Sequence, residues 1–152
     1  MAAGIATLHV FEQESLVENS RQMGELLLEG LRELAGRFEL VKDVRGRGLL
    51  IGIELGEPAS LKLKMGWKVA SKLQKGLVSQ AMVMSLLADH RILTQVAGHG
   101  LEIIKLIPPL VIDESDVKRF LAAFEDVLER SHRFPGPIWE FTTRLAKLAL
   151  KR

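Results

Sequence analysis

The sequence predicts an α+β fold in which helices cover a small, mainly antiparallel sheet. Short apolar segments flank glycine-bearing bends at two places, as in β-hairpins. Longer segments with apolar residues at three- and four-residue spacing come before, between and after these hairpins, which gives the order α–ββ–α–ββ–α. The helices then bury their apolar stripes against one face of the sheet. With 152 residues, 47% of them hydrophobic, the chain is long enough for one domain with a substantial core.

Two helices are predicted before the first hairpin. Apolar residues recur three apart over Ile5–Phe11, although no N-cap residue precedes this segment. A longer helix is expected from Ser15 to about Ala35. Ser15 and Glu18 form a capping-box pattern at its start, and Gly36 suits the C-cap.

The first hairpin and the helices after it are predicted as follows. Two strands, Leu40–Val44 and Leu49–Leu55, are joined by the bend Arg45-Gly46-Arg47-Gly48. Helical spacing of apolar residues then extends over 60–89. Gly76 is the expected break within this stretch, because glycine is unfavourable inside a helix.

The second hairpin is expected from Ile92–Val96 and Leu101–Leu106, which flank Gly98-His99-Gly100. A helix over Asp113–Arg130, with Asp113 as its cap, should follow. A last amphipathic helix is predicted over Ile138–Leu150, with basic residues toward its end.

The overall composition argues against several kinds of partner. Lys and Arg number 21 and Asp and Glu 19, and because the two signs are interspersed no nucleic-acid partner is expected. No apolar run reaches the roughly 18 residues of a membrane helix, and no basic segment precedes the N-terminal apolar stretch. The sequence contains no cysteine, which excludes disulfides and thiolate metal sites and is compatible with a reducing compartment. We therefore expect a cytoplasmic protein without a membrane partner.

The histidines and paired glycines give no local sign of an active site. No metal site is expected, because the histidines lie far apart without metal-ligand spacing; they are His9, His90, His99 and His132. His99 lies where a turn favours polar residues, and presentation of its ring to a ligand or a neighbouring domain is the alternative. Gly46 and Gly48 join two strands and precede no helix, which argues against a nucleotide-binding loop.

Lys105 is the most informative single residue. Its strand neighbours are apolar, so its cation either faces solvent from an alternating strand or is placed to meet an anion. The residues alone leave both interpretations open. Met65, Met82 and Met84 are expected in helix cores, and Trp67 as a packing anchor.

Three motifs in consistent order resemble one protein family. They are AAGIATLHVFEQESLVENSRQMGELLLEGL, then VRGRGLLIGIEL in the first hairpin, and IIKLIPPLVIDESDV, which begins in the last strand of the second hairpin. Together they resemble the C-terminal small domain of class III pyridoxal-phosphate-dependent aminotransferases, a group that includes acetylornithine, ornithine, putrescine and other ω-amino aminotransferases. The resemblance implies a small domain over 1–131, in which 1–14 resembles the interdomain helix, and a C-terminal amphipathic helical extension over 132–152.

The resemblance also implies that the chemistry depends on a region outside this chain. Family members hold pyridoxal phosphate on a lysine of the large domain, which would precede Met1. The chain is then a C-terminal fragment of an enzyme that transfers an amino group from an amine or ω-amino acid to a keto acid. Its expected partners are that large domain and further copies in a homo-oligomer. Alone it should bind no pyridoxal phosphate and be inactive; the alternative is a stand-alone α+β binding or interaction module.

One candidate site residue follows from the resemblance. In many relatives an arginine two or three positions before a Pro-Pro pair binds the substrate carboxylate, and Lys105 occupies that place before Pro108-Pro109. Lysine lacks the bidentate fork, so carboxylate binding should be weaker. This implies an amine substrate without a well-placed α-carboxylate, or a structural role. Arg45 is expected to tether the first hairpin's turn, and no residue is assigned to catalysis.

Overall fold

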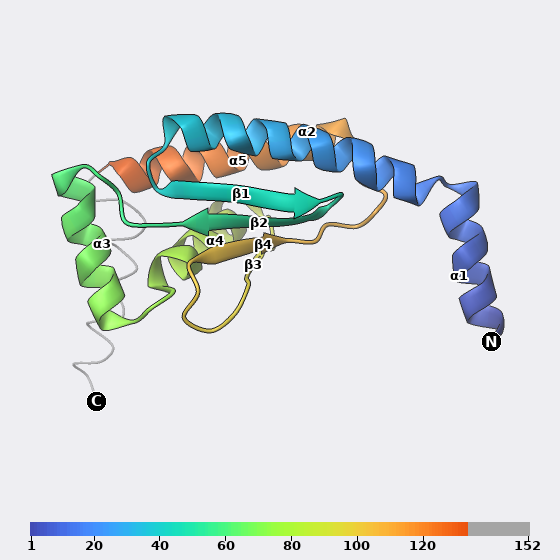
Figure 1. Cartoon of the computed structure of the whole chain (residues 1–152), viewed down its shortest axis with the longest axis horizontal. Helices are drawn as coiled ribbons and strands as arrows, with labels where there is room; N and C mark the ends of the chain where they lie inside the picture. Colours follow the sequence, from blue (N-terminus) through green and yellow to red (C-terminus); the bar gives the residue numbers. More distant parts are fainter. Residues whose placement is uncertain (134–152) are drawn as a thin grey trace.

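The computed structural model describes residues 1–133, except the side chain of Lys62. Within this range the predicted α+β fold is confirmed, with five helices and four strands (Figure 1). The elements are α1 (Ala2–Gln13), α2 (Leu16–Arg37), β1 (Val41–Arg47), β2 (Leu50–Leu55), α3 (Leu61–Leu73), α4 (Leu77–His90), β3 (Gln95–Val96), β4 (Ile103–Leu106) and α5 (Glu114–His132). The helix predicted over Ile138–Leu150 lies outside the described residues.

The four strands form one antiparallel sheet in the order β1-β2-β4-β3. Both predicted hairpins are present, and β4 lies beside β2 in the middle of the sheet. Strand β3 has two residues where the sequence predicted a strand from Ile92. The reason is that the Ile92 N–H donates to the Leu86 carbonyl at 3.0 Å, at the C-terminal end of α4, so this residue is used to end a helix.

Both predicted caps of α2, at Ser15 and at Gly36, are wrong. Ser15 has a positive φ of 49° and makes no side-chain cap hydrogen bond. Glu18 instead forms an ion pair with Arg21, at 2.6 Å. Gly36 lies inside the helix, which ends one residue later, at Arg37. The N–H of Phe38, the residue after the helix, still donates to a helix carbonyl, and the Phe38 ring is buried.

By contrast, the predicted break at Gly76 is confirmed, with a φ of 83° that glycine adopts easily.

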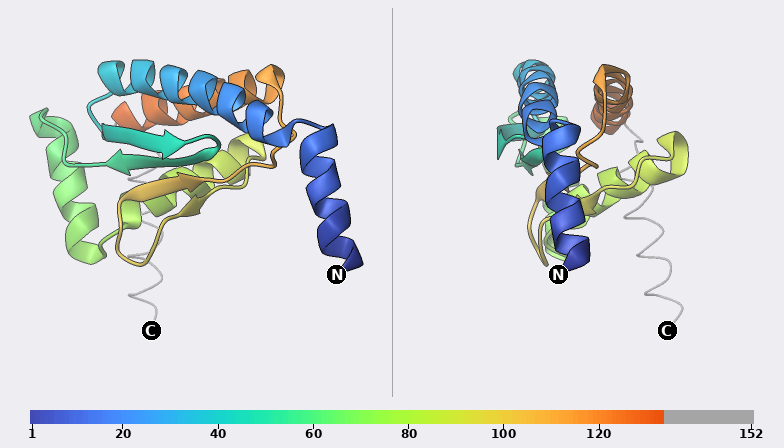
Figure 2. Two further views of the ribbon diagram at one scale, coloured as in Figure 1. Left: turned by 45° about the vertical axis from the view of Figure 1, so that its right-hand side comes forward. Right: turned by 90° about the vertical axis from the view of Figure 1, so that its right-hand side faces the viewer.

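The core lies between one face of the sheet and the helices α2, α4 and α5 (Figures 1 and 2). Trp67 packs against it as predicted. Among the methionines, Met82 is fully buried, but Met65 and Met84 are exposed, so the prediction of a methionine core is wrong for these two. No helix within residues 1–133 is long and apolar enough to cross a membrane.

The turn between β1 and β2 is docked directly on α2. Gly48, with a φ of 54°, lets the chain reverse there. The N–H of Leu49 donates to the Ser20 hydroxyl at 3.2 Å. Opposite the turn, Gly24 of α2 lies so close to the Gly48 backbone that a side chain at Gly24 has no space. The turn and the helix therefore meet backbone to backbone.

The predicted cap at Asp113 is confirmed and gives α5 a pH-dependent start. Its carboxylate accepts hydrogen bonds from the N–H groups of Ser115 and Asp116, at 2.8 and 3.1 Å. The side-chain bond from Ser115 and these two backbone bonds hold the pKa of Asp113 below its ordinary value. A carboxyl with a lowered pKa in the folded state stabilises the fold above its unfolded pKa, and this contribution is lost as the pH falls through the folded pKa.

We therefore expect Asp113→Asn to remove part of the acid sensitivity of the fold. The wild type should be more stable than the variant near neutral pH, and the difference should shrink as the pH falls through the lowered pKa of Asp113. Urea denaturation of both proteins at several pH values measures this difference. If the stability difference between the two proteins stayed constant down to acid pH, the charge of Asp113 would not contribute to the stability of the fold.

Candidate functional site

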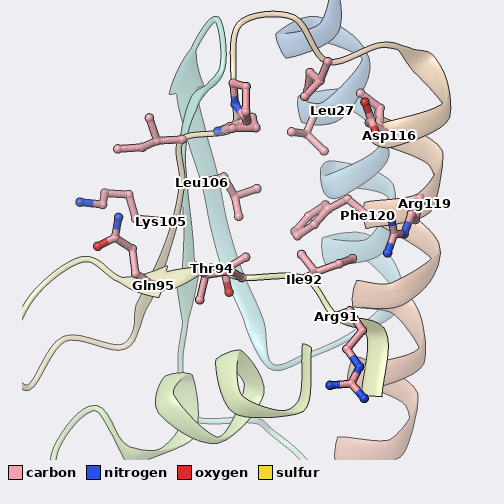
Figure 3. A pocket seen from close by; sticks show the side chains of 16 residues that line it. Leu27, Arg91, Ile92, Thr94, Gln95, Lys105, Leu106, Asp116, Arg119 and Phe120 are labelled. Atoms are coloured by element: carbon pink, nitrogen blue, oxygen red, sulfur yellow. The ribbon is translucent and has the colours of Figure 1, made fainter. Parts of the chain in front are cut away.

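Lys105 lies on the outer face of the sheet, away from the helices of the core. Its neighbours Ile104 and Leu106 are buried on the inner face, and side chains alternate along a strand. In Figure 3 the side chains of Lys105 and Gln95 point together to the side away from Phe120, whereas Leu106 points toward it. Helices α2 and α5 thus leave the lysine uncovered.

The sheet register places Lys105 in one row across all four strands. Arg45 of β1 pairs with Gly52 of β2, Gly52 pairs with Lys105 of β4, and Lys105 pairs with Gln95 of β3. Directly paired residues share a face of the sheet. The outer face therefore carries a cation on each side of a glycine.

The two cations of this row differ in their surroundings. Arg45 Nη1 lies 2.5 Å from Asp43 Oδ2 and 2.6 Å from Glu54 Oε2. The bond from Glu54, and then that from Asp43, raises the pKa of Arg45 above its ordinary value. Arg45 therefore joins the two strands rather than the turn, which corrects the sequence-based expectation. Lys105 forms no ion pair within residues 1–133, so its charge is available to an anion.

Gly52 leaves a notch between these two side chains. A Cβ atom at Gly52 would lie 3.6 Å from Ile103 Cγ2 and 3.9 Å from the Arg45 carbonyl oxygen, both ordinary contact distances. The φ of Gly52 is not positive, so neither the backbone nor the packing requires glycine there. Glycine inside a strand can mark a close approach by another molecule. The row thus has no side chain at Gly52, between Arg45 and Lys105.

A pocket of about 640 Å³ lies where β3 and β4 meet α5 (Figure 3). Its walls are mainly apolar and include Ile92, Leu106 and Phe120. Lys105 is also among the lining residues, but its side chain points to the other face of the sheet. The Thr94 hydroxyl, also in the wall, is buried and has no hydrogen-bond partner among the described residues. A ligand in this pocket would meet apolar walls, one unsatisfied hydroxyl and the charged side chains of Arg91, Arg119 and Asp116.

Asn19 fixes the segment that follows Lys105, a role that no sequence pattern indicated. Its side-chain amide donates to the carbonyls of Leu110 and Ile112, at 2.7 and 3.0 Å. A polar residue on a helix is normally read as solvent-facing, and the partners lie more than ninety residues away. Asn19 thus ties the loop after Pro108-Pro109 to α2.

The described residues do not fit a pyridoxal phosphate site. Such a site needs a lysine beside the cofactor and a partner for the pyridine nitrogen. The pocket's carboxylate, on Asp116, accepts the Asp113 N–H at 3.3 Å in the helix cap. Figure 3 shows it on the opposite side of the sheet from Lys105. Residues 1–133 also contain no cluster of three side chains that could hold a metal ion.

His99 lies in the turn predicted for it. The Leu101 N–H donates to the Gly98 carbonyl at 3.3 Å, and Gly100 has a φ of 70°. The ring is exposed. The turn is therefore confirmed, and presentation of this ring to a ligand stays a prediction.

Comparison with known proteins identifies the family. The family model described as aminotransferase class-III matches residues 1–128. The chain belongs to the class III aminotransferases. Ornithine aminotransferase 1 of Staphylococcus aureus is 35% identical to it over 129 residues, which are 85% of this chain and 26% of the relative.

Solved aminotransferase structures resemble the same part of the fold. An aminotransferase of Bacillus anthracis has 31% sequence identity and a TM-score of 0.62, and the match covers 83% of this chain and 27% of that one. An omega transaminase of Pseudomonas jessenii, solved in complex with PMP, has 28% identity and a TM-score of 0.67, with 86% and 26% covered. This aminotransferase chain therefore spans about a quarter of the length of the relatives it matches. Its family depends on pyridoxal phosphate.

Proposed function

We propose that the chain is the C-terminal small domain of a pyridoxal-phosphate-dependent class III aminotransferase. The complete enzyme transfers an amino group from an amine or ω-amino acid to a keto acid, in the cytoplasm and as a homo-oligomer. The large domain holds the cofactor, and the isolated chain is inactive. The matched share of the relatives, about a quarter of their length, supports this proposal.

The observation that carries the proposal is the uncovered outer face around Lys105. An anion-binding residue in a domain that closes over a substrate must point out of its own core. Lys105 does so from the central part of the sheet, without a carboxylate partner among residues 1–133, and beside the notch at Gly52. We assign the Lys105 ammonium to the anionic group of the substrate, which it binds as a single point charge.

Helix α1 supports a large-domain partner. None of its residues is buried, although Ile5, Leu8 and Val10 are among them. Figures 1 and 2 show α1 extending away from the sheet and the other helices. An apolar helix without a covering surface is stable only when something packs on it. The proposed large domain supplies that cover.

Two measurements test the fragment proposal. The DNA upstream of Met1 should continue in frame into a domain with a cofactor-binding lysine. The purified chain mixed with one equivalent of pyridoxal phosphate should show no stoichiometric aldimine absorbance band. A native stop codon directly upstream would support the stand-alone module instead, and a stoichiometric band would contradict the assignment of the cofactor to the large domain.

The role of Lys105 is tested separately in the complete enzyme. Lys105→Met should raise the KM of the carboxylate-bearing substrate roughly tenfold, because it removes a charged hydrogen bond. Lys105→Arg should lower it through bidentate binding. Lys118→Met is the matched control, since Lys118 is exposed on α5 and is not part of this row. Unchanged KM values in both Lys105 variants would exclude this role without affecting the fragment proposal.

A further inference from the structure

Helix α3 carries a ridge of exposed apolar side chains that the proposed function does not use. Leu61, Met65, Val69 and Leu73 are 76%, 65%, 44% and 55% exposed. Their spacing of four residues aligns them along one side of the helix. The opposite side faces the core, where Ala70 is fully buried. The helix thus has one packed face and one apolar face without a partner among residues 1–133. We call the four exposed residues Leu61, Met65, Val69 and Leu73 the α3 ridge.

A row of lysines runs beside the α3 ridge. Lys64, Lys68 and Lys72 repeat at the same spacing of four. Lys64 is paired with Glu57 at 2.9 Å, whereas Lys68 and Lys72 form no ion pair within the described part of the chain. The sequence from 61 to 76 contains five lysines and no carboxylate. The surface of α3 therefore combines apolar contact area with uncompensated positive charge.

The start of α3 is firmly attached to the rest of the domain. One carboxylate oxygen of Glu39 accepts hydrogen bonds from the N–H groups of Ala59 and Ser60, at 2.7 and 2.9 Å. The side chain of Ser60, and then these backbone bonds, lower the pKa of Glu39. Figure 1 places α3 at the end of the domain opposite α1, outside the sheet. The α3 ridge therefore lies on a helix whose start is held by Glu39, at the end of the domain opposite α1.

We propose that the α3 ridge and its lysine row dock an acidic amphipathic helix of a partner protein. Ridges at i±4 spacing interdigitate with the same ridges of another helix, which accounts for the apolar contact. Carboxylates flanking the partner's apolar row would pair with Lys68 and Lys72, whose charges have no such partner in residues 1–133. Charge complementarity thus selects the occupant.

The same charges argue against three other occupants. In a symmetric pairing with a second copy, lysines would meet lysines along both sides of the contact. The chain's own residues 138–152 carry four cations and one carboxylate. A lipid surface would favour an exposed aromatic anchor, but Trp67, the aromatic residue of α3, packs against the core.

The proposal is tested by calorimetric titration of the full chain with synthetic model helices. One peptide has leucine at four-residue spacing flanked by glutamate, and a second has lysine in place of each glutamate. The glutamate peptide should bind at least roughly tenfold more tightly than the lysine peptide. The double variant K68E/K72E should reverse this preference, and Met65→Gln should weaken binding of the glutamate peptide.

Matched controls distinguish binding at the α3 surface from nonspecific electrostatic and hydrophobic binding elsewhere on the chain. Arg32→Glu changes an exposed cation on α2, and Leu93→Gln changes an exposed leucine elsewhere; neither should alter binding. Circular dichroism verifies that every variant is folded. Equal binding of the two peptides, or binding that survives K68E/K72E unchanged, would overturn the proposal. So would binding to phosphatidylglycerol vesicles without peptide binding, or dimerisation in sedimentation that Met65→Gln abolishes.

Discussion

Replacing Gly24 by alanine is expected to destabilise the chain by about 3 kcal/mol, although alanine is the better helix former. The added Cβ would lie 2.7 Å from the Gly48 Cα and closer still to its carbonyl group. Both sides of this contact are backbone, one held in α2 and the other in a turn with a φ of 54°. Neither can move aside as a side chain would, so the turn must leave the helix. Urea denaturation monitored by circular dichroism gives the free energy of unfolding.

Gly36→Ala is the matched control in the same helix. A Cβ at Gly36 would meet nothing within 4 Å, so only the helix propensity changes. This variant should be more stable than the wild type by up to about 1 kcal/mol. If both variants were stabilised, the close approach of α2 to the β1–β2 turn would not exist in solution.

Replacing Phe124 by alanine should cost about 3–5 kcal/mol, the usual range for removing a buried aromatic ring. Phe124 is fully buried on α5, in the core between helices and sheet, and its ring stacks on Phe120 with centroids 5.8 Å apart. The substitution leaves a cavity lined by residues of several elements, which cannot all collapse into it. Because a domain of this size is stable by roughly 5–15 kcal/mol, much of its stability would be lost.

The control for Phe124→Ala is Leu50→Ala. Leu50 is 57% exposed on β2, so its truncation should change the free energy of unfolding by less than about 0.5 kcal/mol. Thermal and urea denaturation of the two variants distinguish the two sites. Similar small losses in both would mean that α5 is not packed on the sheet.

Much of the architecture follows from local sequence signals. The cap at Asp113 and the break at Gly76 each depend on a few adjacent residues, and both predictions are confirmed. The two hairpins are also confirmed, although β3 begins at Gln95 and not at Ile92. The capping box at Ser15 is wrong because Glu18 has a stronger competitor in Arg21, one turn along the helix surface. A local pattern predicts a cap only when no better partner lies nearby.

The candidate site was predictable only in part. Resemblance and strand alternation singled out Lys105, but its row with Arg45 and Gly52 depends on the register of three strand pairs. Register is set by packing between segments distant in the chain. The contacts of Asn19 with the loop after Lys105, and of Gly24 with Gly48, are also long-range. No local pattern encodes such contacts.

The central place of β4 in the sheet has a consequence for how the polypeptide acquires its shape. Glu54 of β2 pairs with Ile103 of β4, and the helices α3 and α4 lie between these two strands in the sequence. Pairing of β2 with β4 therefore closes a long loop. Loop closure over such a separation is entropically costly and slows folding. On the ribosome, the first hairpin would wait with one edge open until the later strand emerges. We therefore expect Lys105 to reach its place in the row only after the first hairpin has formed.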